Sequence, residues 1–245
     1  MSIDSSVKSA KSANSPSLTE LLPVGLNPIP KAKTIRDQVV ERITHLIVSG
    51  ELPAGTRLTE LGMANMLGVS RVPIREAFLI LQGDQWIDMQ QSQGAKVHVP
   101  RSNEVEEIFQ VRMALESDAA ALASDRHNEG SAELLRLAQQ GRQLILSNPE
   151  GMTKELSDIN ERFHEKLSQD SGNSILIKMI DLMNKKTQMY FTVNITTKRG
   201  IEAWDEHIAI AHAIMNGSRD EAAHLTRTHI QASWEHFQSL MNQRH

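Results

Sequence analysis

The sequence contains no cysteine, few aromatic residues and no long apolar run. Without cysteine, the chain has no disulfide, no thiolate metal ligand and no cysteine nucleophile. Aromatic residues make up 4% of the chain, and the common residues Leu, Ile, Ala, Met, Glu and Gln favour helices over a β-rich fold. No run reaches the roughly 18 apolar residues of a membrane span. The sequence therefore predicts a cytoplasmic protein that does not enter the membrane.

The charge balance does not indicate nucleic-acid binding. The net charge is −4 over 245 residues, and residues 34–101 carry 7 basic and 7 acidic side chains. DNA binding by this chain would therefore depend on where individual arginines lie. The length suits two modest domains. We expect a flexible tail, rich in Ser, Pro, Lys and Asn, over residues 1–33, followed by domains over residues 34–100 and 101–245.

The stretch after residue 60 has the pattern of a helix-turn-helix. An apolar-periodic helix ends at Gly68, and Ser70 can cap a second helix by accepting a hydrogen bond from a backbone N–H. Pro73 falls in the first turn of that second helix, where a missing N–H costs little. Arg71 and Arg75, four residues apart, lie opposite the apolar face. A major-groove reader needs this arrangement, because arginine can pair bidentately with guanine or bind phosphate.

A β-hairpin is predicted after this helix. Residues 86–89 and 96–99 alternate like strands, and the turn between them contains Gly94. The tip of the hairpin, with Gln93, Gly94 and Lys96, forms a wing that could reach the minor groove or the DNA backbone. The alternative is that the hairpin only packs against its own domain.

These motifs occur in the order found in one family of bacterial regulators. Gly50-x-Leu52-x-x-Gly55-x-x-Leu58, followed by Val69-Ser70-Arg71-x-Pro73-x-Arg75-Glu76-Ala77, resembles the winged helix-turn-helix of GntR-type regulators. The resemblance covers about residues 34–99. It implies a homodimer that presents two recognition helices to a pseudo-palindromic operator. The residues expected to contact DNA are Arg57, Thr59, Ser70, Arg71, Pro73, Arg75, Gln93, Gly94 and Lys96.

The rest of the chain is helical in pattern. Six segments with short connections predict an antiparallel bundle, so the expected fold is mainly α with one small hairpin. A break at residues 198–200 is predicted from Gly200. The helical segments are 103–124, 131–147, 153–169, 173–197, 201–216 and 219–242.

Three histidines lie on the apolar faces of three of these helices: His164, His207 and His229. A single inward histidine is most often a hydrogen-bonded core residue. Three of them, with Asn160 one turn before His164, favour a metal site in the bundle core. Neutral imidazoles suit Zn, Ni, Fe or Mn, and a carboxamide oxygen is an acceptable fourth ligand. The alternatives are a purely structural metal and a hydrogen-bonded core without metal.

This part of the chain is similar to the FCD ligand-binding domain, the C-terminal half of the FadR branch of GntR regulators. The matching pattern is Asn160-x-x-Phe163-His164, Ser171-Gly172-Asn173, His207, Ala213-Ile214 and His229. Many members of that family hold a divalent metal with an Asp or Asn and three His, which implies Asn160, His164, His207 and His229 as ligands here. Asn in place of Asp leaves the ion more positive. This change should weaken metal binding yet favour an anionic effector.

Arg112 starts on the apolar side of its helix, so its guanidinium group needs an anionic partner. That partner is either an internal carboxylate, Glu116 or Asp158, or the carboxylate of a small ligand that also binds the metal. Effectors of FCD proteins are often small organic acids, so the resemblance implies a small carboxylate effector. Further candidates for its pocket are Asn173 together with Thr192 or Asn194.

The sequence predicts a metabolite-responsive transcription regulator that acts as a repressor. Effector binding near the metal would shift the bundle and reorient the DNA-binding domains. The alternative from another class is a metal-dependent hydrolase, because three histidines with an open position can activate water. That alternative lacks a general base, since Glu161 and Glu165 flank His164 but point elsewhere. It also leaves the DNA-binding motif unexplained.

Overall fold

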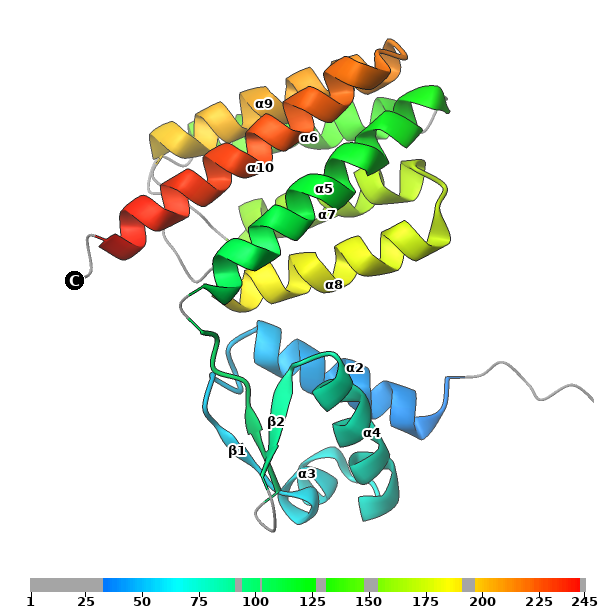
Figure 1. Ribbon diagram of the computed structural model, residues 1–245, viewed down its shortest axis with the longest axis vertical. Helices are drawn as coiled ribbons and strands as arrows, with labels where there is room; N and C mark the ends of the chain where they lie inside the picture. The colour runs from blue at the N-terminus through cyan, green and yellow to red at the C-terminus, as the bar shows by residue number, and fades with distance from the viewer. Residues whose placement is uncertain are drawn as a thin grey trace, which may run out of the picture. The chain divides into compact units, whose positions relative to one another are not determined.

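The computed structural model describes residues 33–90, 94–101, 103–126, 131–147, 154–190 and 197–242. The expected tail up to residue 32 and the candidates Gln93, Thr192 and Asn194 lie outside these ranges. The described chain is mainly helical with one three-stranded antiparallel sheet (Figure 1), as predicted for the fold class. None of its helices is long and apolar enough to cross a membrane.

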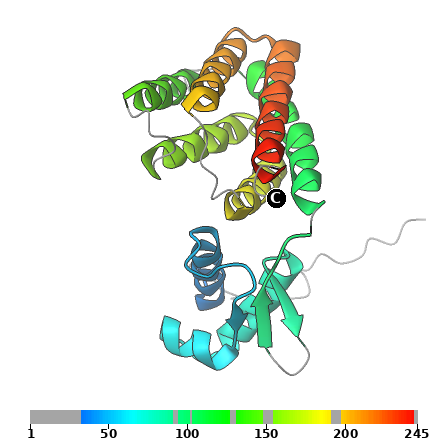
Figure 2. The ribbon, with the colours of Figure 1, turned by 90° about the vertical axis from the view of Figure 1, so that its left-hand side faces the viewer.

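The N-terminal part has the elements of a winged helix-turn-helix. The predicted hairpin is present, but its second strand is Gly94–Val97 and not residues 96–99, so Gly94 lies in a strand and not in the turn. A third strand, β1 (Arg57–Leu58), completes the sheet in the order β1-β3-β2 (Figure 2). The sequence pattern does not predict β1, because two residues are too few to show alternation. The pairing places Arg57 opposite Lys96. The elements are α2 (Ile35–Val48), β1 (Arg57–Leu58), α3 (Glu60–Leu67), α4 (Arg71–Gly83), β2 (Ile87–Gln90) and β3 (Gly94–Val97).

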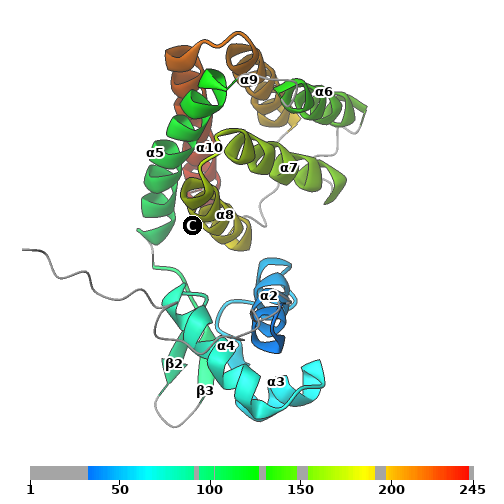
Figure 3. The same ribbon diagram turned by 90° about the vertical axis from the view of Figure 1, so that its right-hand side faces the viewer.

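The helices α3 and α4 form the helix-turn-helix (Figure 3). The Thr59 hydroxyl caps α3 by accepting a hydrogen bond from the Gly62 N–H, and Gly68 ends that helix in a left-handed conformation. The predicted cap of α4 is wrong, because the Ser70 side chain makes no capping hydrogen bond. A cap contributes about 1 kcal/mol, whereas each large apolar side chain contributes about 1.5–3 kcal/mol when buried. Burial therefore holds α4, through Ile74, Ala77, Phe78 and Leu81.

His98 links the end of the hairpin to the start of α5 (Glu104–Asp125). Its Nδ1 lies 3.0 Å from Asp88 Oδ1, and its Nε2 lies 3.0 Å from Glu104 Oε2. Burial lowers the pKa of His98, but hydrogen bonds and charge attraction from Glu104 and Asp88 outweigh it, so the pKa is raised overall. The imidazolium form is therefore favoured by the fold.

We expect His98 to stabilise the protein at mildly acidic pH and to lose this effect at alkaline pH. Because its pKa in the folded chain exceeds the usual 6.5, the stabilisation is complete below about that value and disappears as pH rises through the folded pKa. His98→Asn should lower the free energy of unfolding by on the order of 1.5 kcal/mol at pH 6 and by far less at pH 9. Urea denaturation at both pH values measures this. An equal loss at both would contradict it, and the exposed His212→Asn serves as control.

Six helices make up the described helical part, as predicted. The expected break at residues 198–200 is wrong, because α9 (Thr197–Met215) runs through it. Thr197, the expected last residue of the helix over 173–197, is the first residue of α9, and residues 191–196 of that expected helix lie outside the described residues. A glycine within a helix costs only about 1 kcal/mol, and the helical course lets Arg199 reach Glu206 two turns later. The helices are α5, α6 (Ser131–Ser147), α7 (Lys154–Asp170), α8 (Ser174–Tyr190), α9 (Thr197–Met215) and α10 (Arg219–Asn242).

These helices pack around a common hydrophobic core, and one close contact determines the position of α9. In the figures α5 lies beside α10, and α6 lies beside α9 (Figures 1 and 3), in agreement with their contacts. Gly141 of α6 allows the Trp204 ring of α9 to approach, since a Cβ there would lie 2.4 Å from ring atoms. Trp204 is itself buried. This close approach fixes α9 with His207, one turn after Trp204, in the interior.

Candidate DNA-binding face and histidine cluster

The two arginines at the start of α4 point away from the core. Their side chains are 60% and 63% exposed for Arg71 and Arg75. Both contact Glu60, the first residue of α3, through hydrogen bonds of 2.9 Å. These bonds lower the pKa of Glu60 to about 2. The carboxylate is therefore ionised, and the exposed arginines are linked across the helix-turn-helix.

The structure also places the other described DNA-binding candidates. Arg57 and Lys96 are register neighbours on β1 and β3. Gly94 is required in β3, because its φ is +88° and a Cβ would lie 2.5 Å from the Leu58 carbonyl oxygen. Pro73 is half-buried in the first turn of α4, whereas Ser70 and Thr59 are exposed. Contact of these residues with DNA remains a prediction.

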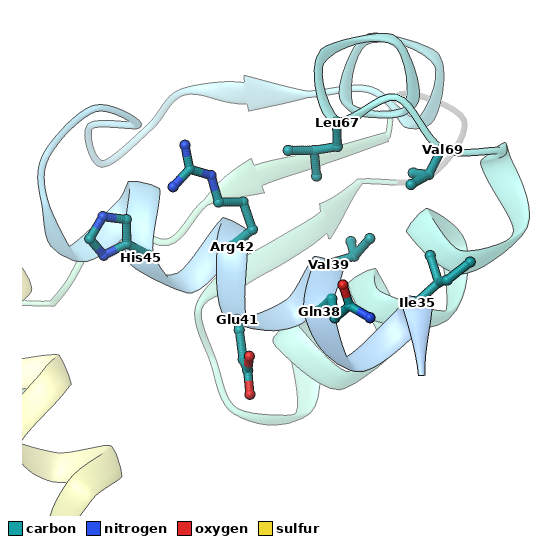
Figure 4. A pocket seen from close by; sticks show the side chains of 8 residues that line it. All are labelled: Ile35, Gln38, Val39, Glu41, Arg42, His45, Leu67 and Val69. Atoms are coloured by element: carbon teal, nitrogen blue, oxygen red, sulfur yellow. The ribbon is translucent and has the colours of Figure 1, made fainter. Parts of the chain in front are cut away.

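A groove of about 510 Å³ lies between α2 and the turn that joins α3 to α4. In Figure 4 Ile35, Val39 and Arg42 point from α2 towards the side of Leu67 and Val69, whereas Glu41 points the other way. It is lined by both apolar and charged side chains. The candidate metal ligands His164, His207 and His229 are not among its lining residues. Its lining residues are Ile35, Gln38, Val39, Glu41, Arg42, His45, Leu67 and Val69.

The three histidines meet inside the helical part, as predicted. His164 of α7, His207 of α9 and His229 of α10 are at most 5% exposed. One potential ligand atom of each lies within 4.8 Å of the others. The Nε2 atoms of His207 and His229 are 3.1 Å apart. Phe163 stacks on His207 with ring centroids 4.1 Å apart, which holds that ring in place.

A buried arginine and carboxylate support His164. Arg112 Nε donates to Glu116 Oε1 at 2.7 Å, and Glu116 Oε2 lies 2.7 Å from His164 Nδ1. Burial alone would raise the pKa of Glu116, but attraction to Arg112 and His164 outweighs it and lowers the pKa to about 2. Of the two internal partners left open for Arg112, Glu116 is the observed one. Asp158 is exposed.

A second arginine and carboxylate, which the sequence pattern does not predict, support His229. Glu206 Oε2 lies 2.6 Å from His229 Nδ1, and Arg199 donates to both Glu206 oxygens at 2.7 and 2.9 Å. Burial would raise the pKa of Glu206, yet hydrogen bonds from His229 and Arg199 lower it overall. The spacing of Arg199 and Glu206 by two helical turns was the available signal. The break predicted at Gly200 places Arg199 and Glu206 in different segments, so this spacing does not indicate an ion pair.

The cluster has the chemistry of a divalent-metal site. Two nitrogens bound to one ion at about 2.0–2.1 Å are about 2.9–3.4 Å apart, which matches the 3.1 Å between His207 and His229. Metal-ligating histidines commonly donate their other N–H to a carboxylate, as His164 and His229 can do here. His207 Nδ1 is buried with no hydrogen-bond partner among the described residues. The donor set therefore fits an ion such as Zn, Ni, Fe or Mn.

Burial keeps two of these histidines in the form that binds metal. It lowers the pKa of His207 well below its usual value, and protonation of His229 or His164 would lower this pKa further by charge repulsion. It also lowers the pKa of His229. Neutral imidazole is the metal ligand, so protonation does not compete at neutral pH.

The two amide candidates in the described chain, Asn160 and Asn173, are more exposed than the three histidines. Asn160 is half-buried on α7, one turn before His164. Asn173 is exposed, and its Oδ1 caps α8 by accepting from the N–H groups of Ile175 and Leu176. Its part in effector binding remains a prediction.

The comparisons with known proteins now decide the family. Residues 35–97 match the bacterial regulatory proteins of the gntR family, and residues 107–232 match the FCD domain. The chain belongs to the GntR family, in the group with a C-terminal FCD domain. Both resemblances inferred from the motifs are confirmed.

Relatives and solved structures agree with this assignment. The uncharacterized HTH-type transcriptional regulator YdhC of Bacillus subtilis is 25% identical over 207 residues, which cover 84% of this chain and 92% of YdhC. The probable D-xylose utilization operon transcriptional repressor of Paenarthrobacter nicotinovorans is 23% identical, covering 81% and 87% of the two chains. The structure of E. coli McbR/YncC has the same fold, with a TM-score of 0.70, 23% identity and coverage of 85% and 100%.

This GntR-family protein is a transcription regulator and not an enzyme. The hydrolase alternative is therefore wrong. The histidine cluster belongs to the FCD domain, since all three histidines fall within the matched residues.

Proposed function

We propose that this GntR-family protein is a cytoplasmic repressor that binds operator DNA as a homodimer and responds to a small carboxylate bound beside a divalent metal. Residues 34–100 would bind DNA, and residues 101–245 would bind the effector and hold the dimer together. The observation that carries the proposal is the buried cluster of three histidines, two of them supported by carboxylates. A relative named as a probable operon repressor supports the direction of control.

The DNA-binding half of the proposal rests on the exposed start of α4. Arg71 and Arg75 would read base edges or bind phosphate, and Ser70 would add a backbone contact. Arg57 and Lys96, adjacent on the sheet, would contact the DNA backbone together with the wing. A weakly charged module gains affinity when a dimer doubles these contacts.

The metal would be held by His164, His207 and His229, with the Asn160 carboxamide as fourth ligand. When bound, it supplies a positive charge to which a carboxylate oxygen can coordinate. Arg112 would bind the same carboxylate: it gives Nε to Glu116 and one long contact of 3.5 Å to Thr187. A guanidinium group has five N–H donors, so donors remain for an anion.

Helix α5 offers a route from this site to the DNA-binding part. Its first residue, Glu104, contacts His98 at the end of the hairpin. Arg112 and Glu116, further along the same helix, contact the histidine cluster. If α5 occupies two positions, an effector that binds Arg112 more tightly in one of them would shift the population towards that position.

Elemental analysis of tag-free protein, paired with thermal unfolding against a panel of small carboxylates, tests the proposal. We expect about one metal per chain. An acid present at about 100 times its Kd should contribute about 2.7 kcal/mol, which raises the Tm by about 5–10 °C. The double variant Asn160→Ala/His207→Ala should stay folded and lose both metal and response.

The exposed His212→Ala serves as control and should change neither quantity. Metal content that is unchanged in the double variant would contradict the ligand assignment. Protein without metal and without a shift for any acid would contradict the sensor proposal, while the DNA-binding assignment would stand.

A further inference from the structure

Glu60 joins the two arginines that are expected to contact DNA. Its carboxylate accepts three hydrogen bonds of 2.9 Å, one from Arg71 Nη2 and two from Arg75 Nε and Nη2. Glu60 begins α3 and Arg71 begins α4, so these contacts connect the two helices of the helix-turn-helix. The Glu60 side chain is 22% exposed, far less than either arginine.

The contacts leave both arginines able to bind DNA. An arginine has five N–H donors, of which Arg75 gives two and Arg71 gives one to Glu60. The two bonds from one edge of Arg75 fix the plane of its guanidinium group and leave the outer edge free for a base. Bidentate recognition of guanine needs two donors in a fixed plane. Fixing the plane beforehand reduces the rotamer freedom lost on binding.

We propose that Glu60 is a positioning residue that determines DNA specificity: it orients Arg71 and Arg75 for base recognition and offsets one of their two charges. The inference rests on the proposed DNA contacts of these arginines. A matching sequence gains from the fixed orientation, whereas arbitrary DNA gains mainly from positive charge. Glu60 therefore raises specific affinity relative to non-specific affinity.

The local charge distribution supports this role. Two exposed arginines without a carboxylate would add two phosphate-binding charges, whereas the three side chains together carry one. A carboxylate at the first residue of α3 is also favoured by the helix dipole. With 7 basic and 7 acidic side chains over residues 34–101, bulk charge does not hold this part on DNA. The loss of one carboxylate should therefore be measurable.

The test compares two duplexes with the full-length protein by fluorescence anisotropy at several salt concentrations. One duplex is recovered by the unaltered protein from a randomised pool, and the other is its scrambled version of equal length and composition. For Glu60→Gln we expect the ratio of the two affinities to fall at least about fivefold. The scrambled duplex should bind more tightly, with a salt slope steeper by about one.

Two further variants separate orientation from charge. Glu60→Asp keeps the charge but is too short to hold both arginines, so it should lower the ratio without steepening the salt slope. It also decides the question if Glu60→Gln does not fold. Glu51→Gln removes one charge from an exposed turn of the same part and should leave the ratio unchanged.

Arg75→Ala separates the proposed DNA contact of Arg75 from the positioning role of Glu60. If Arg75→Ala weakens binding to the recovered duplex while both Glu60 variants keep the full ratio, the role of Glu60 is overturned and the proposed arginine contacts stand. If Arg75→Ala leaves that affinity unchanged, the arginine contact and the role of Glu60 are both overturned.

Discussion

Replacing Arg71 and Arg75 together with alanine is expected to weaken binding to the operator at least about 30-fold, because each bidentate arginine contact contributes about 1–3 kcal/mol. Both side chains are more than half exposed and face away from the core. Their ion pairs with Glu60 lie at the surface, where such pairs contribute about 0–1 kcal/mol. The free energy of unfolding should therefore change by less than about 1 kcal/mol. Anisotropy with the recovered duplex and urea denaturation measure the two quantities.

Arg136→Ala is the matched control for this double variant. Arg136 is also about half exposed and paired with a glutamate, but it lies on α6 in the FCD domain. It should leave DNA affinity unchanged within about twofold. Loss of affinity in both variants would point to general charge rather than recognition by α4. No loss in the double variant would contradict the proposed recognition surface.

The recognition helix could be predicted from sequence because its features are local. Gly68, Pro73 and the spacing of the arginines each determine backbone or side-chain direction within a few residues. The error at Ser70 has the same origin: residue type favours a cap, but whether the hydroxyl reaches an N–H depends on how α4 is held. Here the buried face of the helix decides its position.

The histidine cluster could also be predicted, since helical spacing reveals which face each histidine occupies. Its supporting network could be predicted only in part. Glu116 lies one turn from Arg112 on the same helix, so it appears among the candidates. The pair Arg199 and Glu206 is not predicted, because Gly200 favours a helix break between them, whereas α9 continues through this glycine and the ion pair forms within it. The contacts from Glu116 to His164 and from Glu206 to His229 join different helices, and such contacts leave no periodic signal in one sequence.

Glu116→Gln is expected to cause the largest loss of stability. Glu116 is fully buried and holds both Arg112 and His164. Glutamine keeps the shape but leaves a buried arginine without a charged partner, which costs about 3–5 kcal/mol when such a pair is broken. The Tm should fall by about 6–20 °C for a chain of this size. Calorimetry with a chelator present separates this loss from any effect of metal.

Two further variants identify the cause of the loss. Glu133→Gln breaks the exposed pair with Arg136 and should cost less than about 1 kcal/mol. Arg112→Met combined with Glu116→Leu removes both buried charges and should recover much of the stability lost in Glu116→Gln, because apolar replacement of a buried ion pair is often neutral or stabilising. If the double variant is no more stable than the single one, the unpaired charge is not the cause. If it recovers, this buried pair contributes little net stability, and its position beside His164 is better explained by ligand binding than by folding.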